Sequence, residues 1–442
     1  MINNIINNLK HIPHYLLAII IITALQLSIL SLSACIPSSL IQTNMEESAS
    51  YLLANDVFFN ANSYDSGSRI DRYADSILLG IAYSYDNRHP ITSVISSAYY
   101  HTDTANENVN LYVAVTNKYS PNLNYVRYWH GSIAIIRPLL TIFNLKQIYI
   151  LNAVILTFLF LTLLINTKKV LGIAPMFCLI IAGITTSIWY VPMSLEYTWT
   201  IIIMCIASII ALHTYDKSNH FLRLFFLITG SLTAYFDFLT TETLTLMLPL
   251  ALILIARYDS NINQNAKRHL KSTVCMCVFW FIGYASAWIM KWLLASIILN
   301  ENIFKTAFSQ AAVRINGETD SLTGLSRQLG AIIRNLSCLF PFSLIPNNGY
   351  VICILFFVLI FIIYFLIRME TCNSFANLLI LIALVPYLRF LILSNHSYIH
   401  YFFTFRAQFT TIFCIGMAFV YGTDKALLEK EWRKLCKIPK KK

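Results

Sequence analysis

Acids, histidines and arginines are the residues of this chain that could do chemistry, and they occur in short stretches beside apolar runs. Asp71 and Asp75 stand four apart in DRYAD, and His130 and Arg137 lie in HGSIAIIRP. Ionisable side chains beside or inside long apolar segments are costly to bury, so they mark candidate functional sites.

Three further stretches carry the same residue types. Glu196 lies in SLEYTW, Asp237 and Glu242 lie in DFLTTE, and HSYIHYFFTFR holds His396, His400 and Arg406. His396 and His400 are four residues apart and share one face of a helix. Each group alone also fits solvation at a membrane interface, and Arg406 could reach water along its own stem.

Carboxylates and arginines together suit a reaction in which a hydroxyl attacks and an anion leaves. A carboxylate can act as general base on the hydroxyl, while arginine binds a phosphate through paired donors. A sugar carried on a polyprenyl phosphate is a donor of this kind, because its lipid lies in the bilayer and its head group reaches the interface. We therefore expect one polar cavity at one face of a membrane.

Apolar helices must hold these residues in place. Of the 442 residues, 57% are hydrophobic and 12% are charged, whereas soluble domains average about 25% charged. The apolar residues come in runs of about 20, the length of a membrane-spanning helix. The sequence predicts an all-α polytopic membrane protein, a single domain over 1–442, with about ten spans at 14–35, 147–166, 172–191, 197–214, 221–237, 242–257, 273–295, 351–368, 376–394 and 402–421.

The charge distribution predicts the orientation of these spans. Lys and Arg gather in short connections, such as Lys168 and Lys169, and in the tail 422–442. By the positive-inside rule these parts face the cytoplasm, so both termini are predicted to be cytoplasmic. Two long loops, 36–146 and 296–350, then face outwards, and the candidate residues all fall on that side.

The first outer loop is predicted to contain two ordered segments. Apolar residues at 70, 73, 77, 78 and 81 share one helical face, which predicts an amphipathic juxtamembrane helix on the membrane surface. The apolar part of 131–143 is too short to span, and Pro138 disfavours a helical Arg137. A re-entrant or interfacial segment is expected there, with Arg137 facing the same cavity as Asp71 and Arg406.

Composition argues against several other kinds of site. The net charge of +11 follows the loops and the tail, so the expected charged partners are membrane lipids and no nucleic acid. The ten cysteines lie mostly in apolar runs without CxxC spacing, so neither a disulfide framework nor structural zinc is expected. Cys35 ends an LSAC pattern like that of a lipoprotein signal; an uncleaved first span is favoured, with lipidation of Cys35 left open.

The long first outer loop, its acid-bearing helix soon after the first span and the many later spans resemble the GT-C superfamily of integral-membrane glycosyltransferases. DRYAD is similar to the DE…RYAE segment of the aminoarabinose transferases that modify lipid A, although here Asp71 directly precedes Arg-Tyr and no Asp-Glu pair is present. RYWHG, YFDFLT and HSYIHYFFTFR resemble stretches of uncharacterised bacterial membrane proteins associated with surface polysaccharide. Phage-type serotype-converting O-antigen glucosyltransferases share the size and class. The resemblance implies a bacterial inner-membrane enzyme whose active site faces the periplasm.

These observations give a hypothesis for each residue. The protein would be an inverting hexosyltransferase that moves a sugar from a polyprenyl-phosphate-linked donor to a glycan or glycolipid acceptor, such as O-antigen. The base would be Asp71 or Asp75, and the donor phosphate would be bound by Arg137, Arg406 and His400. The acceptor side of the cavity would be formed by His130, Glu196, Asp237, Glu242 and His396. No motif demands a cofactor, and a divalent cation held by these acids and histidines is left open.

An O-antigen polymerase and a lipid-carrier flippase or transporter are the alternatives. A polymerase would also act on polyprenyl-linked glycans at the outer face, and Arg314, Arg327 and Arg334 in the second outer loop keep it open. A transporter is disfavoured because no internal repeat is evident and the polar residues avoid mid-span positions.

Overall fold

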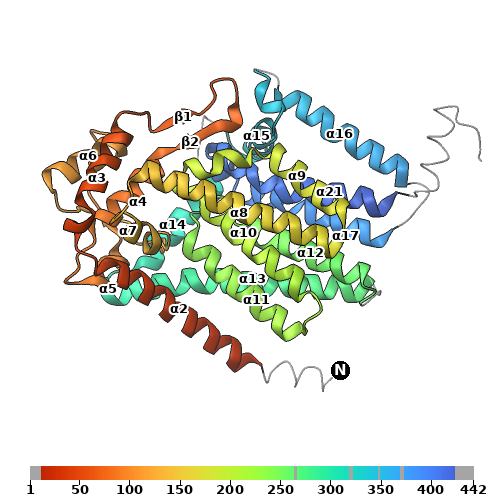
Figure 1. The fold of residues 1–442 in the computed structure, drawn as a ribbon, viewed down its shortest axis with the longest axis horizontal. Coiled ribbons are helices and arrows are strands. Elements are labelled where there is room, and N and C mark those ends of the chain that lie inside the picture. Colours follow the sequence, from red (N-terminus) through yellow and green to blue (C-terminus); the bar gives the residue numbers. More distant parts are fainter. Residues whose placement is uncertain (1–10, 263–265, 318–321, 347–348, 369–372, 424–442) are drawn as a thin grey trace, which may run out of the picture.

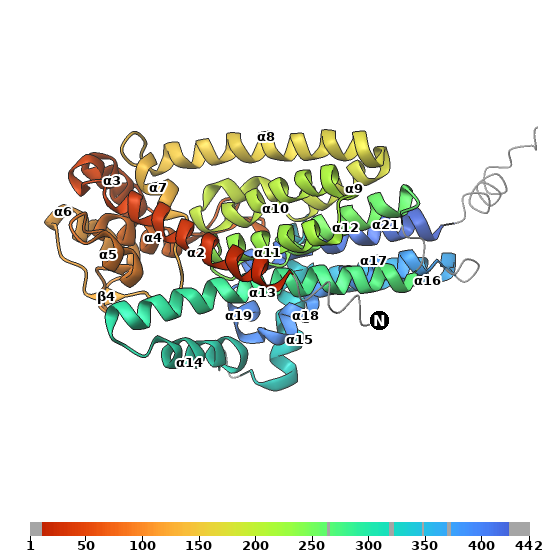
Figure 2. The same cartoon turned by 90° about the horizontal axis from the view of Figure 1, so that it is seen from below.

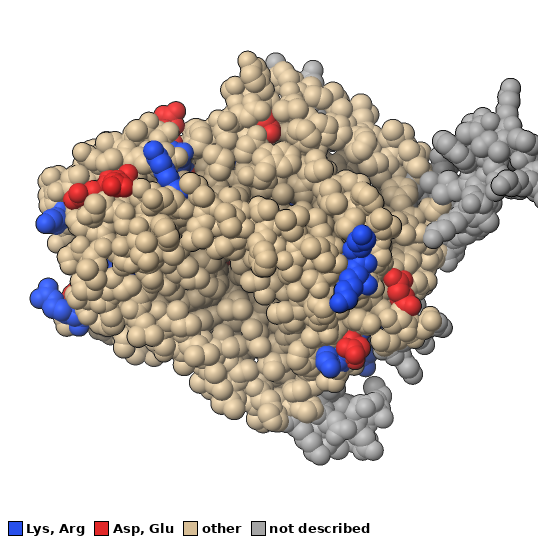
Figure 3. Space-filling model, viewed as in Figure 1, with Lys and Arg blue, Asp and Glu red and all other residues tan. Residues whose placement is uncertain are grey.

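The structure is a computed structural model, and it describes residues 11–262, 266–317, 322–346, 349–368 and 373–423. Long apolar helices run side by side along the longest axis, and a group of shorter elements covers one end of them (Figure 1, Figure 2). On the face in Figure 3, most charged side chains lie towards the two ends, and the band between them is largely free of charge. The basic tail predicted to fix the orientation lies outside the described residues.

Six helical segments are long and apolar enough to cross a membrane. They are Ile12–Ala34, Leu145–Leu171, Leu195–Thr214, Leu270–Leu299, Ser374–Ile392 and Tyr401–Gly422. They correspond to α2 (Ile12–Ala34), α8 (Leu145–Leu171), α10 (Leu195–Thr214), most of α13 (Ala266–Leu299), the pair α17 (Ser374–Ala383) and α18 (Val385–Ile392), and the run from α20 (Tyr401–Thr404) through η4 (Phe405–Ala407) to α21 (Gln408–Gly422). An all-α membrane protein is therefore confirmed, whereas the count of ten spans is not.

Helices also form at the other four predicted spans. These are α9 (Ile173–Thr185), continued by η2 (Ile188–Met193), α11 (Asn219–Phe236), α12 (Leu244–Asp259) and α16 (Gly349–Arg368). The first three are shorter or less apolar, whereas the fourth has 20 residues and is strongly apolar. Every residue of α12 from 244 to 257 is buried, because α12 contacts α8, α10, α11, α13, α17 and α21. A helix that is apolar all round is expected at such a central position.

The first outer loop folds into small elements packed on one another at one end of the helical bundle. Its helices are α3 (Ser38–Leu53), α4 (Arg72–Ser84), α5 (Pro90–Ser96), α6 (Glu107–Asn117) and α7 (Ile133–Leu139), with η1 at Ser66–Ser68. Two antiparallel strand pairs join β1 (Phe58–Asn60) to β2 (Arg69–Asp71) and β3 (Ala98–Tyr99) to β4 (Leu123–Asn124). We call residues 36–144 the outer subdomain.

Two details of the outer subdomain differ from the prediction. The expected amphipathic helix forms as α4, but α3, α6, α7 and α10 surround it, so its polar residues Arg72, Asp75 and Ser76 are buried in protein as well. Arg137 is helical despite the following Pro138, because α7 continues through Pro138 to Leu139. The re-entrant segment is thus a short helix packed against α2 and α4.

The second outer loop contributes α14 (Ile303–Asn316), α15 (Gly324–Ser337) and η3 (Phe342–Leu344). Both helices pack on α19 (Ser394–Ile399), which connects the last two apolar segments. The predicted histidine stretch 396–406 is therefore broken into α19, α20 and η4 instead of opening one continuous helix.

Glycines allow α11 and α13 to approach closely. A Cβ on Gly230 would lie 2.0 Å from the Trp280 carbonyl oxygen, and one on Gly283 would lie 1.9 Å from the Leu227 carbonyl oxygen. Small residues that let helix backbones touch are a common basis of helix packing in membranes. This contact holds α13, which lines part of the site described below.

Replacing either glycine with valine is expected to separate α11 from α13. The branched side chain would meet backbone rather than a movable side chain, so we expect a loss of more than about 2 kcal/mol of stability for Gly230→Val or Gly283→Val. Thermal unfolding followed by fluorescence-detected gel filtration in detergent measures this loss. Gly80→Ala is the control, because a Cβ there makes only an ordinary contact, 3.4 Å from Tyr99. Equal melting temperatures for all three variants would contradict the close contact.

Candidate functional site

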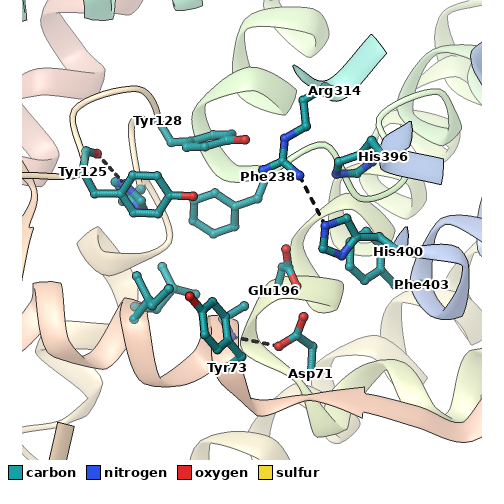
Figure 4. A pocket seen from close by; sticks show the side chains of 14 residues that line it. Asp71, Tyr73, Tyr125, Tyr128, Glu196, Phe238, Arg314, His396, His400 and Phe403 are labelled. Atoms are coloured by element: carbon teal, nitrogen blue, oxygen red, sulfur yellow. Dashed lines mark hydrogen bonds between the residues drawn. The ribbon is translucent and has the colours of Figure 1, made fainter. Parts of the chain in front are cut away.

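A small polar cavity lies where the outer subdomain meets the adjacent ends of the apolar helices. Its volume is about 110 Å³. Figure 4 shows acids on one side and a cation with two histidines on the other, with aromatic rings beside them. The lining residues are Asp71, Tyr73, Ala74, Ile77, Leu78, Tyr125, Tyr128, His130, Glu196, Phe238, Arg314, His396, His400 and Phe403.

The acidic wall of the cavity consists of Asp71 and Glu196. Asp71 is the N-cap of α4 and accepts a hydrogen bond from the Ala74 amide at 2.9 Å. Burial raises the pKa of Asp71 to about 6, against the lowering effect of that amide and of Arg69. Glu196 lies in the first turn of α10, and its buried Oε2 has no hydrogen-bond partner. Two carboxyl groups from distant segments therefore border one space.

The opposite wall offers hydrogen-bond donors. Arg314 Nη1 lies 3.3 Å from His400 Nε2. Because a guanidinium can only donate, Nε2 of His400 must accept, which places the imidazole proton on Nδ1. That Nδ1 is buried and has no partner. The His396 ring lies 4.7 Å from the His400 ring. Arg314 and His400 thus present a charged and a neutral donor to a ligand.

His130 provides an acceptor of fixed character. Its Nε2 donates to the Tyr125 carbonyl oxygen at 3.0 Å, since a carbonyl can only accept. The lone pair is then on Nδ1, which is buried without a partner. Burial, assisted by the charges of Lys291 and Arg127, lowers the pKa of His130 to about 3. His130 is therefore neutral at physiological pH and is a poor general base.

Asp75, the second candidate base, does not line the cavity. Its carboxylate accepts hydrogen bonds from the Tyr149 hydroxyl, from the Ser194 hydroxyl and from the amides of Leu195 and Glu196. It is fully buried. Through these bonds the Asp75 carboxylate joins α4 to α8 and to the N-terminus of α10. The dipole of α10 also favours an anion at that N-terminus. The structure thus gives Asp75 a structural position and leaves Asp71 as the acid with access to a ligand.

The prediction that Arg137 faces the same cavity as Asp71 is wrong. The guanidinium of Arg137 is fully buried in the outer subdomain and donates to the carbonyl oxygens of Ala82, Ile36 and Tyr85. Buried backbone carbonyls need donors, and Arg137 supplies several at once.

Arg406 also lies outside the cavity lining. It donates to the carbonyl oxygens of Phe402 and Gly67, and its guanidinium stacks over the Tyr197 ring at 4.9 Å. It therefore joins η4 to η1. The expectation that Arg406 shares a cavity with Asp71 is wrong for a similar reason: its Nη1 and Nη2 donate to backbone carbonyl groups.

Asp237 and Glu242 are not in the cavity lining either, because each is bound within its own turn or by a neighbouring helix. Asp237 accepts from the Thr240 amide at 3.1 Å. Glu242 forms a buried ion pair with Arg389, with Nε–Oε1 at 2.9 Å. Arg389 in turn lies 3.4 Å from His396 Nδ1. The pair supports the histidine side of the cavity from behind.

A larger apolar groove lies between α13 and α14 and meets the polar cavity. Its volume is about 380 Å³, and Tyr128 and Arg314 line both spaces. Trp288 and Trp292, one turn apart on α13, form its wall together with Phe308 of α14. The groove is thus a mainly apolar space whose wall shares the cation of Arg314 with the cavity that holds the acids.

The sequence prediction gave the tyrosines no role and named Arg314 only as support for the polymerase alternative. Arg314 was one of several arginines in the second outer loop, and no spacing distinguished it from Arg327, which binds the carbonyl oxygens of Gly317 and Ile315. Tyr73 and Tyr125 stand beside recognised residues, but such aromatics are ordinary at membrane interfaces. Only the folded arrangement shows that they border the acids.

No group of three or more His, Cys, Asp or Glu residues is placed to hold a metal ion within the described part of the chain. Comparisons with known proteins add no assignment: no family model matches the chain, and neither a curated protein nor a solved structure matches it. The site is therefore interpreted from its own geometry.

Substitutions of Asp75 and of Asp71 distinguish an acid with a structural role from an acid with a chemical role. We expect Asp75→Ala to lose roughly 2–4 kcal/mol of stability, because buried donors from α8 and from the start of α10 lose their acceptor. Asp71→Ala removes a single cap and is expected to lose about 1 kcal/mol. Melting temperatures of the purified variants in detergent compare them. A smaller loss for Asp75→Ala than for Asp71→Ala would contradict the structural role.

Proposed function

We propose that the protein is an inverting glycosyltransferase that moves a sugar from a polyprenyl-phosphate donor to a hydroxyl of a surface glycan or glycolipid. The observation that carries the proposal is that an apolar groove and a small cavity with acids lie side by side and share Arg314 and Tyr128 in their walls. A sugar linked through phosphate to a polyprenyl chain has its parts in the matching order: an apolar chain, an anion and a polar ring. A hydroxylated ring with apolar faces also suits the aromatic walls formed by Tyr73, Tyr125 and Phe403.

The proposed reaction is a single displacement. Asp71 takes the proton of the acceptor hydroxyl, and the hydroxyl oxygen forms a bond to the anomeric carbon. The bond from that carbon to the phosphate oxygen breaks, and the phosphate leaves with the electron pair. Arg314 and the Nδ1–H of His400 stabilise the charge that develops on the phosphate. Attack from the face opposite the leaving group inverts the anomeric centre.

We further propose that α9, α11, α12 and α16 complete ten crossings of a bacterial inner membrane, with the cavity on the periplasmic side. Charge supports this orientation. Lys168 and Lys169 lie in the last turn of α8 and Arg257 in the last turn of α12, whereas the cavity lies at the N-terminus of α10. Cations at one end and the polar cavity at the other agree with the positive-inside rule.

Asp71→Asn is expected to reduce glycan modification at least about 10²-fold, since it removes the base, while Asp75→Asn keeps a folded and active protein. Because only the ionised form of Asp71 accepts a proton and its pKa is about 6, wild-type activity is expected to rise with pH through about 6. Gel analysis of the surface glycan from cells with equal expression measures the product. Loss of chain length instead of a branch would indicate a polymerase, and full activity of Asp71→Asn would contradict the assignment.

Arg314→Gln is expected to weaken use of the lipid donor by about 10²-fold, because a charge-assisted contact to phosphate is lost. Arg314→Lys should retain part of the activity, since it keeps the charge without the paired donors. Arg88→Gln is the matched control, because Arg88 is exposed in the outer subdomain and pairs only with Asp86 among the described residues. Transfer of labelled sugar in membrane vesicles measures the effect. Equal transfer by Arg314→Gln and Arg88→Gln would exclude a phosphate contact at Arg314.

A further inference from the structure

We propose that Asp71 and Glu196 are an unequal pair, in which Glu196 holds a proton and donates a hydrogen bond to the ligand while Asp71 carries the negative charge. This assigns Glu196 to recognition of a ligand oxygen, such as a sugar hydroxyl or ring oxygen. The role in sugar recognition rests on the proposed function. The location of the proton rests only on the structure.

The first reason is the crowding of carboxyl groups. Asp71, Asp75 and Glu196 are 4%, 0% and 6% exposed, respectively. Asp71 and Glu196 line the same small cavity, and Asp75 accepts a hydrogen bond from the backbone amide of Glu196, so the three acids share one buried region. Carboxylates that share a buried site cannot all ionise at neutral pH, and at least one keeps its proton.

The second reason is the unequal supply of hydrogen-bond donors. Asp75 accepts four hydrogen bonds. Asp71 accepts one from the Ala74 amide at the positive end of α4. Glu196 forms no ion pair among the described residues, and its buried Oε2 has no partner. A buried carboxylate without donors is the costliest of the three to ionise, so the proton belongs on Glu196.

The third reason is the position of Arg314, which among the described residues is the only Lys or Arg in the cavity lining. Arg314 extends towards His400, to which it donates, while Glu196 lies lower in the cavity beside Asp71 (Figure 4). Arg314 forms no ion pair with Glu196 among the described residues, so no direct contact with the cation offsets the burial of that carboxyl group. A protonated Glu196 adds a neutral donor on the acidic side, opposite to the charged donor of Arg314.

This arrangement has a chemical consequence for the base. A neutral Glu196 can hold the sugar by a hydrogen bond without competing with Asp71 for the proton of the acceptor hydroxyl. His130 complements it as a neutral acceptor in the same lining. The cavity then recognises hydroxyl groups with uncharged partners and keeps a single negative charge for catalysis.

Infrared spectroscopy of the purified protein tests the location of the proton without any assay of activity. At pH 7 the wild type is expected to show the C=O stretching band of a protonated, buried carboxyl group, with a shift in heavy water. Glu196→Gln should remove that band, whereas Glu46→Gln, an exposed acid on α3, should leave it unchanged. A band that persists in Glu196→Gln and disappears in Asp71→Asn would overturn the proposal, because the proton would then be on Asp71.

Glycan modification in cells tests the donor role. Glu196→Gln retains an N–H donor at this position and is expected to keep more than about a tenth of the wild-type level. Glu196→Leu has no donor and is expected to fall below about a hundredth, with expression checked by gel filtration. Equal loss in both variants would overturn the donor role. If the infrared result holds while Asp71→Asn remains active, the proton assignment stands and the proposed glycosyl transfer fails.

Discussion

The hydrogen bonds of the Asp75 carboxylate set the geometry on which the site depends. One side chain of the outer subdomain caps the N-terminus of α10 and binds Tyr149 of α8. Asp71 lies one helical turn before Asp75, and the backbone amide of Glu196 donates a hydrogen bond to the Asp75 carboxylate. Both acids of the cavity are therefore positioned by the same buried carboxylate. Asp75, which has no access to a ligand, therefore fixes the separation of Asp71 and Glu196, which do have access.

Buried cations attach the outer subdomain to the apolar helices in a similar way. Lys291 of α13 donates to the carbonyl oxygens of Val94 and Ile95 at the end of α5, and Trp129 donates to the Ala287 carbonyl oxygen of α13. Arg137 draws α7 to α4 and to the segment after α2. Each cation sits at carbonyl groups that regular secondary structure leaves without donors. Cations beside apolar runs in this protein mainly donate hydrogen bonds to backbone carbonyl groups. The proposed catalytic role applies to Arg314.

The sequence was sufficient for the fold class and for the helix at 72–84, because both depend on local composition and periodicity. Asp71, Glu196, His130, His396 and His400 were also found from residue type beside apolar runs, and the structure brings these five to one cavity. The sequence could not distinguish these five residues from Arg137, Arg406, Asp237 and Glu242, which also stand beside apolar runs. The two groups differ in whether residues distant in sequence already form hydrogen bonds with their polar atoms. The local sequence pattern contains no information on such contacts.

The opening of the groove beside α13 has a consequence for how the proposed enzyme would meet its donor. A lipid that enters between α13 and α14 arrives by diffusion within the plane of the bilayer, while an acceptor glycan arrives from the aqueous side through the polar cavity. The two substrates would then never compete for one entrance, and the spent carrier would return to the membrane by the path it came. Turnover would depend on the surface density of the carrier and on the fluidity of the membrane, more than on any concentration in solution.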